Sequence, residues 1–348
     1  MSNIKSKKKK LLSGSFSVLL GLTLLVSSSS VSATVNTFGK WSNRTQTMYA
    51  VTTASQTHWS NGAAKWKNST NYNISVASGL NSTYYSQDVN KSDVDWDGLC
   101  TFTVNNGIIS KAILNLNTYY TSQSKYTSSI IAGVTGHEIG HSLGLEHTSV
   151  VETSSIMHPY TFNSNGTIER ALNPSASDKT VVNNLYPLSK LAANRVDLGL
   201  SSEDISIHLE PSWAVYYEDE AALMKAADLV IRGRVAEKIG NKAAKGNYSN
   251  YNTLVNIQVS DVIKGTKMVG ENIAMSQMGG TDGKVEVYSD SSTHLKEKQE
   301  VLLFLRQSSD GTFRPINEDD SIFLLEDGGY HNIADQQLIN EKKILSNL

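Results

Sequence analysis

Three of the chain's eight histidines lie within the stretch GHEIGHSLGLEH. His137 and His141 are four residues apart, so a helix would place both imidazoles on one face, where they can bind the same metal ion. Glu138 would lie about 100° further round that helix, within reach of a water molecule in the site, as a general base must be. Gly144 allows a tight turn that brings His147 back as a third ligand. Three imidazoles leave one position of a tetrahedral zinc ion open, so the spacing predicts a catalytic zinc site.

The segment that must position these side chains reads IIAGVTGHEIGHSLGL. Ile130, Val134, His137 and His141 recur at intervals of four, three and four residues, which predicts one face of a helix. A histidine on such a face can equally be an ordinary core residue. The glycine and the third histidine at fixed offsets make a chance match about a thousandfold rarer, which favours the metal site.

The stretch HEIGHSLGLEH matches the metzincin pattern H-E-x-x-H-x-x-G-x-x-H at every fixed position. A methionine-bearing turn lies beneath the metal in that family, and Met157 in SIMHPY follows the third histidine by ten residues. The SIM-x-P form of this turn, the SLG beside the second histidine and the closing DKTVVNNLYP resemble the matrixin branch, especially its secreted bacterial type. The resemblance covers residues 37–187.

This resemblance implies a zinc metalloprotease that hydrolyses protein or peptide substrates. It implies one catalytic Zn²⁺ bound by His137, His141 and His147, with Met157 in the Met-turn. Glu138 would take a proton from the attacking water and pass it to the leaving amine.

Three residues of the resembling segment need separate comment. Matrixins usually have a tyrosine directly after the turn methionine, where this chain has His158, and here Tyr160 directly follows the proline. His158 either lines the specificity pocket or adds an adventitious fourth ligand, and the open position of a catalytic zinc favours the pocket. Cys100 lacks the flanking arginine and proline of a matrixin cysteine switch, so it is expected to be a buried small side chain without a role in latency.

Residues 1–33 predict a signal peptide, because a lysine-rich start precedes an apolar run and the small-residue end Val31-Ser32-Ala33. Without the five lysines of this segment, 26 basic and 33 acidic side chains remain, a net charge of −7. This balance argues against nucleic acid as a partner. The chain is therefore expected to be secreted, possessing no membrane span after cleavage, and its single cysteine excludes an internal disulfide.

The predicted organisation has two folded parts. Residues 34–187 should form an α/β matrixin-like domain with a twisted mixed sheet, a zinc helix and a Met-turn. Residues 188–212 are expected to be a linker. Residues 213–348 contain several apolar, strand-like runs between glycine-containing turns, which predicts a mainly β domain, a barrel or a sandwich.

The acidic segment DVDWDG, residues 93–98, is a further possible ion site. Val104 stands where an EF-hand would need a glutamate, so the segment is either a solvated acidic turn or a calcium loop of another kind.

Two classes of function compete. The first is a secreted zinc endopeptidase with Glu138 as its base. The alternative is a secreted binding or adhesion module built on a metalloprotease-like scaffold, although a scaffold would have no need of the glutamate. The C-terminal half carries no catalytic motif, so it should bind or regulate, and a chain ending near Pro187 should still cleave a short peptide.

Overall fold

The computed structural model describes residues 37–188, 205–244, 247–281 and 285–339. The predicted signal peptide, residues 1–33, lies outside this range, as does the first part of the predicted linker. Within the described residues, none of the helices combines the length and the apolarity needed to cross a bilayer. The helices are α1 Thr53–Lys67, α2 Thr118–Thr121, α3 Ser128–Ser142, α4 Ala176–Leu185, α5 Glu220–Ala226 and the 3-10 helix η2 Glu318–Ser321.

The first sheet has nine strands, and its main path runs β11-β12-β7-β4-β5-β3-β1-β2, with β6 paired to β7. The pairs β1–β2, β1–β3 and β3–β5 are parallel, whereas β4 is antiparallel to both β5 and β7. The strands are β1 Thr45–Ala50, β2 Asn73–Ser78, β3 Tyr84–Val89, β4 Trp96–Asn105, β5 Ile108–Asn117, β6 Tyr160–Asn163, β7 Ile205–Tyr216, β11 Gly280–Thr281 and β12 Glu286–Tyr288.

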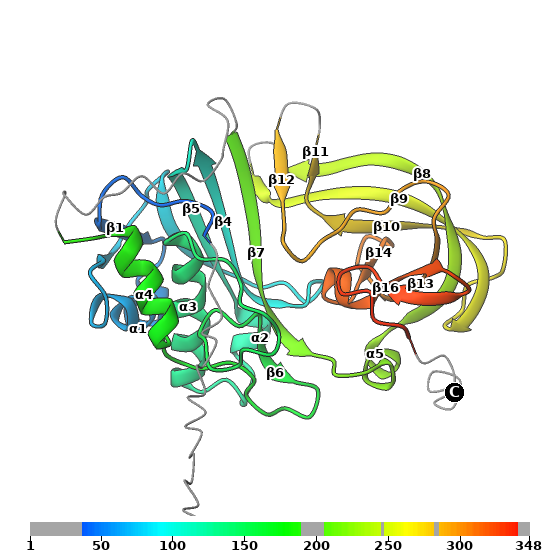
Figure 1. The fold of residues 1–348 in the computed structure, drawn as a ribbon, viewed down its shortest axis with the longest axis horizontal. Helices are drawn as coiled ribbons and strands as arrows, with labels where there is room; N and C mark the ends of the chain where they lie inside the picture. Colours follow the sequence, from blue (N-terminus) through cyan, green and yellow to red (C-terminus); the bar gives the residue numbers. More distant parts are fainter. Residues whose placement is uncertain (1–36, 189–204, 245–246, 282–284, 340–348) are drawn as a thin grey trace, which may run out of the picture. The chain divides into compact units, whose positions relative to one another are not determined.

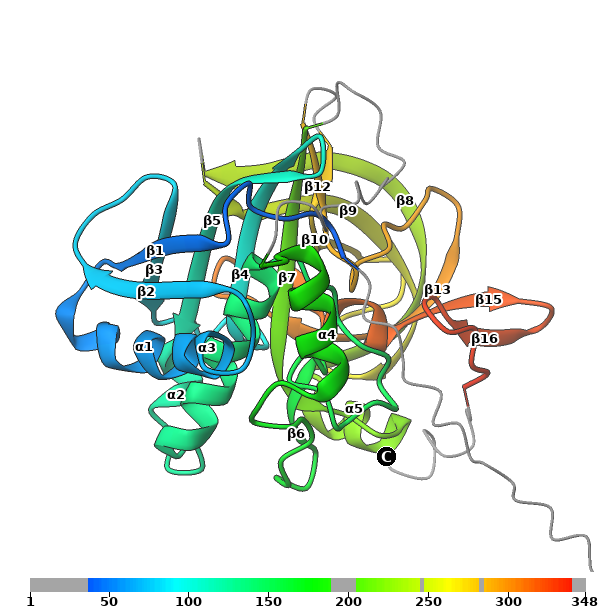
Figure 2. The ribbon, with the colours of Figure 1, turned by 60° about the vertical axis from the view of Figure 1, so that its left-hand side comes forward.

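Helices α1, α3 and α4 pack on one face of this sheet (Figures 1 and 2). Helix α1 begins at its N-cap, where the Thr52 hydroxyl accepts a hydrogen bond from the Ser55 N–H. Trp59 and Trp66, which the helical spacing predicts to share a face, are fully buried. The Trp66 indole donates to the backbone carbonyl of Gly136 at 2.7 Å, which joins α1 to α3. The predicted α/β fold with a mixed sheet is confirmed.

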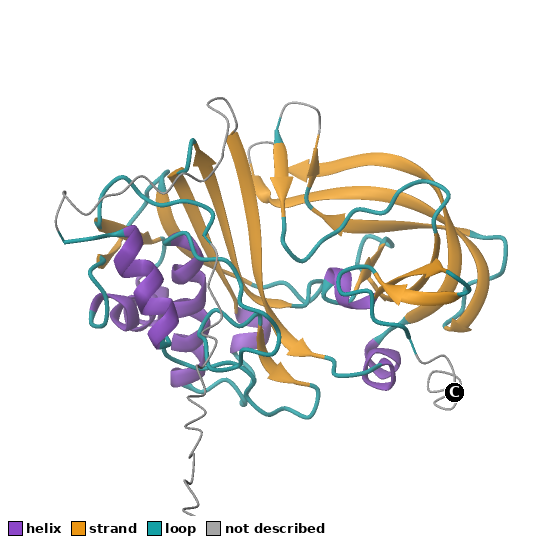
Figure 3. Ribbon diagram, in the orientation of Figure 1, coloured by secondary structure: helices purple, strands orange, loops and turns teal. Residues whose placement is uncertain are grey.

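The second sheet belongs to the C-terminal part, in which strands outweigh the two short helices in Figure 3. Its order is β14-β10-β9-β8-β13-β15-β16, and an additional β13–β14 pairing closes five of these strands into a ring. The predicted mainly β character of this part is therefore confirmed. The strands are β8 Leu229–Ala244, β9 Asn247–Lys264, β10 Asn272–Met278, β13 Glu300–Gln307, β14 Phe313–Pro315, β15 Ile322–Glu326 and β16 Gly329–Asn332.

The predicted linker, residues 188–212, is wrong over its second part. Residues 205–212 begin β7, which pairs with β4 from Ile205 to Trp213 and so extends the first sheet. The sequence ISIHLEPSWAVY hides this strand, because it contains a proline and a glutamate where a central strand ordinarily has neither. The chain is therefore not divided into two domains with separate sheets and a linker between them, because the second part of the predicted linker belongs to the first sheet.

Candidate metal centre and active site

Helix α3 delivers the first two histidines of the site. Its N-cap is Thr127, and every residue from Ile130 to Ser142 is buried. The helix ends at Leu143, and Gly144 follows with a positive φ of 101°, as the tight turn requires. A side chain at Gly144 would also place its Cβ 1.8 Å from the carbonyl oxygen of Gly39. The backbone conformation and the close approach both select glycine here.

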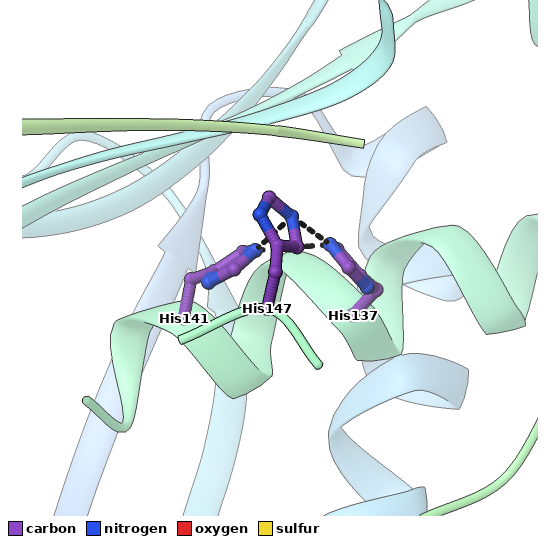
Figure 4. Close-up of side chains that lie close together, drawn as sticks. All are labelled: His137, His141 and His147. Atoms are coloured by element: carbon purple, nitrogen blue, oxygen red, sulfur yellow. Dashed lines mark hydrogen bonds between the residues drawn. The ribbon is translucent and has the colours of Figure 1, made fainter. Parts of the chain in front are cut away.

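The turn brings the three predicted ligands together, with their rings pointing toward one another in Figure 4. The Nε2 atoms of His137 and His141 are 2.9 Å apart, and the Nε2 of His147 lies 3.2 Å from the first and 3.1 Å from the second. These three histidines form one of the groups in the described residues whose ligand atoms lie within 4.8 Å of one another.

The protonation of these rings follows from the partners of their other nitrogens. Nδ1 of His137 lies 2.7 Å from the carbonyl oxygen of Ile156, and Nδ1 of His141 lies 2.8 Å from that of Leu145. A carbonyl oxygen only accepts, so both Nδ1 atoms carry the proton. Nδ1 of His147 likewise faces the Asp290 carboxylate at 2.8 Å. In the neutral rings all three Nε2 atoms are then bare lone pairs.

Three bare lone pairs about 3 Å apart repel one another unless a cation lies between them. The dashed contacts of Figure 4 cannot be hydrogen bonds in this protonation state, since neither nitrogen of a pair has a proton to donate. Zinc–nitrogen bonds of about 2.0–2.1 Å in a tetrahedral arrangement require nitrogens about 3.3 Å apart. The donor set therefore fits a zinc ion. Burial lowers the pKa of His137 and of His141 well below its usual range, which keeps both rings neutral as ligands.

The predicted Met-turn packs against α3 beside the histidines. Met157 is fully buried, and a Cβ added to Gly140 would come within 2.3 Å of its sulfur. The turn is held by Asp178 of α4, whose carboxylate accepts from the Ser155 hydroxyl at 2.7 Å and from the Ile156 N–H at 3.3 Å. Ile156 in turn accepts from His137. The closing helix therefore fixes the orientation of one metal ligand through the turn.

Glu138 lies beside the triad without belonging to it. Its side chain is fully buried, and in the described part of the chain neither carboxylate oxygen makes a hydrogen bond of normal geometry. Burial raises its pKa well above the usual range of a glutamate. Gly98 of β4 packs directly on this group, since a Cβ there would lie 2.3 Å from Oε1. The charge of Arg170 and a hydrogen bond from the Cys100 backbone N–H oppose this shift. A buried carboxylate with a raised pKa, one residue along the helix from His137, is suited to exchanging protons with a small molecule at the site.

Two carboxylates that the sequence pattern does not indicate also reach the site. Asp290, which follows β12, makes the 2.8 Å contact with His147. Although burial opposes it, the adjacent imidazole of His147 holds the pKa of Asp290 well below its usual range. Glu210 of β7 is fully buried with Oε2 3.9 Å from the same Nδ1. Its burial, followed by the charge of Asp290, raises its pKa well above the usual range. Both residues come from the C-terminal half.

The acidic segment, residues 93–98, is not a solvated turn. Asp95 is buried and paired with Arg306, Nε to Oδ1 3.1 Å, and with Arg314. Asp97 is buried as well and accepts from the Tyr126 hydroxyl at 2.7 Å. The expectation of solvation was wrong because the counter-charges lie more than 200 residues away along the chain. Arginine partners for Asp95 also leave no support here for a calcium loop.

His158 is buried and takes no part in the triad. Its Nε2 lies 3.1 Å from the Val150 carbonyl oxygen and its Nδ1 lies 3.3 Å from that of Tyr160. Burial lowers its pKa to about 4. The ring thus holds the segment after the Met-turn in place, and the metal-ligand alternative for His158 is wrong. Cys100 is buried in β4 with a free thiol, as predicted.

The comparisons with known proteins agree with this geometry. The sequence model of one family, Matrixin, matches residues 16–187. The chain contains a matrixin-like metzincin domain. The predicted resemblance to the matrixin branch of the metzincins is thereby confirmed, and zinc metallopeptidase activity is the activity of that class.

Two solved structures are similar to part of this chain. One is entitled "Structure of myroilysin"; it is 18% identical and has a TM-score of 0.30, over 43% of this chain and 96% of that one. The other is high choriolytic enzyme 1, a hatching enzyme zinc-protease from Oryzias latipes, at 14% identity and a TM-score of 0.27, over 42% of this chain and 92% of that one. The search of curated proteins found no match. The assignment of the domain rests on the family match and the triad.

Proposed function

We propose that the chain is a secreted zinc endopeptidase with Glu138 as its general base. The observation that carries this proposal is the convergence of three bare Nε2 atoms, together with the fully buried carboxylate of Glu138 on the same helix, for which the described residues supply no side-chain hydrogen bond. A binding module on the same scaffold would need the three ligands but would gain nothing from burying this glutamate, which costs free energy. Secretion is proposed from the lysine-rich start, the apolar run and the small residues that end at Ala33.

His137, His141 and His147 would hold the zinc ion, whose positive charge would polarise the substrate carbonyl and make water more acidic. Glu138 takes one proton from the attacking water while the oxygen of that water bonds to the carbonyl carbon. The same carboxyl group then gives that proton to the nitrogen as the C–N bond breaks, which yields a carboxylic acid and an amine. A raised pKa suits this shuttle, because the group must bind the proton and then release it within one turnover.

Asp290 supports the reaction through His147. A carboxylate on Nδ1 fixes the tautomer and the orientation of a metal-binding imidazole, so that Nε2 stays directed into the site. Asp290 touches neither the substrate nor the reacting atoms in this proposal, and it is a positioning residue.

The test uses residues 34–348 and a short, unstructured fluorogenic peptide. The wild type should cleave it, lose activity with a zinc chelator and regain it with added zinc. Glu138→Gln should keep zinc and fold but lose at least a hundredfold in rate, since the amide cannot accept the proton. Cleavage by Glu138→Gln at the wild-type rate would remove this residue from the mechanism. Zinc binding with no cleavage of any peptide by the wild type would favour the binding module.

A further inference from the structure

Without β7, β4 would be the edge strand of the sheet in the matrixin-like domain. Within residues 37–188, the order of the sheet places β4 outside β5, next to the zinc helix, and nothing else in that range pairs with its other edge. A free strand edge presents a row of unpaired N–H and C=O groups that can bind an extended peptide by forming a new strand. Here β7, which lies beyond the segment matched by the family, fills that edge.

β7 passes directly over the metal centre. It runs antiparallel to β4 and, at its far end, parallel to β6, which begins three residues after the Met-turn methionine (Figure 1). The N–H of Trp213 donates to the Pro159 carbonyl at 2.8 Å. Between its pairing with β12 and its pairing with β6, β7 presents Glu210, whose carboxylate lies 3.9 Å from the third ligand, His147. An extended chain therefore already lies across the site.

The site is closed while β7 is in place. The side chain of His147 is 7% exposed, and His137, His141 and Glu138 have no exposed surface at all. Residues 209–214 of β7 are buried too. An endopeptidase must admit a substrate chain that continues on both sides of the bond it cuts. A triad that is buried under β7 therefore becomes accessible to such a substrate only if β7 moves.

β7 is held by side chains as well as by its backbone. The Ser212 hydroxyl donates to Asp97 of β4 at 2.6 Å, and the guanidinium of Arg170 donates to Ser212 and lies 3.7 Å from the same carboxylate. These three groups are fully buried. A substrate that displaces β7 would have to make up for the loss of these contacts with a side chain of its own at the position of Ser212.

We propose that β7 is an internal competing strand, which occupies the channel between β4 and β6 where a peptide substrate of a matrixin-like domain would bind. A peptide substrate binds by replacing β7 in the same direction, antiparallel to β4. Its backbone can form the hydrogen bonds that β7 gives up, so the side chains at the positions of Glu210 and Ser212 determine which peptides compete well. The inference rests on the peptidase function proposed above.

The chain offers a way to lock β7 reversibly. Cys100 of β4 is directly opposite Glu210 in the register, and Cα atoms of opposed antiparallel residues are about 4.5–5.5 Å apart, within the range of disulfides. The variant Glu210→Cys can therefore form a β4–β7 disulfide when oxidised and release it when reduced. Glu210→Ser is the matched control, because it removes the same carboxylate but cannot form the bond.

The probe is a peptide hydroxamate, which binds the zinc-loaded protein without turnover. Reduced Glu210→Cys and both redox states of Glu210→Ser should bind it, whereas oxidised Glu210→Cys should bind at least tenfold more weakly. Hydrogen exchange followed by mass spectrometry should show faster exchange in residues 205–216 and protection of residues 96–105 when the probe binds the wild type. Equal binding by both redox states of Glu210→Cys would overturn the inference. So would failure of the zinc-loaded, reduced protein to bind the probe, or unchanged exchange in β7.

The same samples separate this inference from the proposed function. A wild type that binds the probe and displaces β7 but cleaves no peptide would contradict the peptidase and leave the competing strand standing. Cleavage that is equally fast with β7 locked would retain the peptidase and refute the competing strand.

Discussion

The contact between Asp290 and His147 makes the C-terminal half part of the proposed metal centre, and removal of this contact has a predictable effect. Asp290→Ala deletes a charge-assisted hydrogen bond of 2.8 Å to Nδ1 of a metal ligand. Loss of such a partner typically weakens metal binding by about 10–100-fold. The Asp290 side chain is 31% exposed, so water can replace part of the lost bond. We therefore expect the lower end of that range, about tenfold, or about 1.4 kcal/mol.

The assay is a competition titration of zinc against a chromophoric chelator, at one pH and ionic strength, with residues 34–348. Asp327→Ala is the matched control, because Asp327 is exposed in the turn between β15 and β16. Its substitution removes the same charge outside the triad. The control should bind zinc as the wild type does. Equal zinc affinity of Asp290→Ala and Asp327→Ala would refute the positioning role of Asp290. Loss of affinity in both would indicate a general charge effect.

Three further predictions concern the strand over the site, the base and the acidic 3-10 helix. Ser212→Ala should speed peptide cleavage at low substrate concentration about three- to tenfold, because β7 loses its hydrogen bond to Asp97 and competes less well; initial rates at several peptide concentrations check this, and a slower variant would contradict it. Gly98→Ala should retain zinc yet lose most turnover, since the new Cβ would lie 2.3 Å from Oε1 of Glu138 and displace the carboxylate. Metal analysis together with a rate measurement tests this. A wild-type rate would contradict it, because it would show that β4 shifts to accommodate the methyl group without disturbing Glu138. Burial raises the pKa of Glu318 from 4.5 to about 8, so the folded state binds this proton more tightly than the unfolded state does. The unfolding free energy should therefore fall as the pH rises from about 4.5 to 8, by at most about 5 kcal/mol. Denaturant titrations should find a smaller fall in Glu318→Gln, and an identical pH dependence in the two proteins would refute the raised pKa of Glu318.

The parts of the site that are close together in the chain could be predicted from the sequence. His137, Glu138 and His141 share one helix, and Gly144 and His147 follow within a single turn, so local spacing alone positions them. The Met-turn could be anticipated only through the resemblance to metzincins. Nothing in the spacing indicates that Asp178 of α4 would hold that turn, although a serine three residues before it is a recognisable capping pattern.

The parts that depend on long-range pairing could not be predicted. Asp290 lies 143 residues beyond His147, and neither belongs to a motif that includes the other. β7 was missed because Pro211 and Glu210 argue against a central strand, although here the glutamate faces the metal centre. The acidic segment was misinterpreted for the same reason, since Arg306 and Arg314 come from the second sheet. A buried charge in such cases can be understood only when the distant partner is known.

The most direct test of the central claim is a paired measurement of zinc content and peptide cleavage on the wild type, His141→Ala and Glu138→Gln, each as residues 34–348. The account predicts close to one zinc per chain in the wild type and in Glu138→Gln, much less in His141→Ala, and cleavage by the wild type alone. Wild-type zinc content in His141→Ala would contradict the assignment of the three imidazoles, and full activity in Glu138→Gln would contradict the assignment of the base.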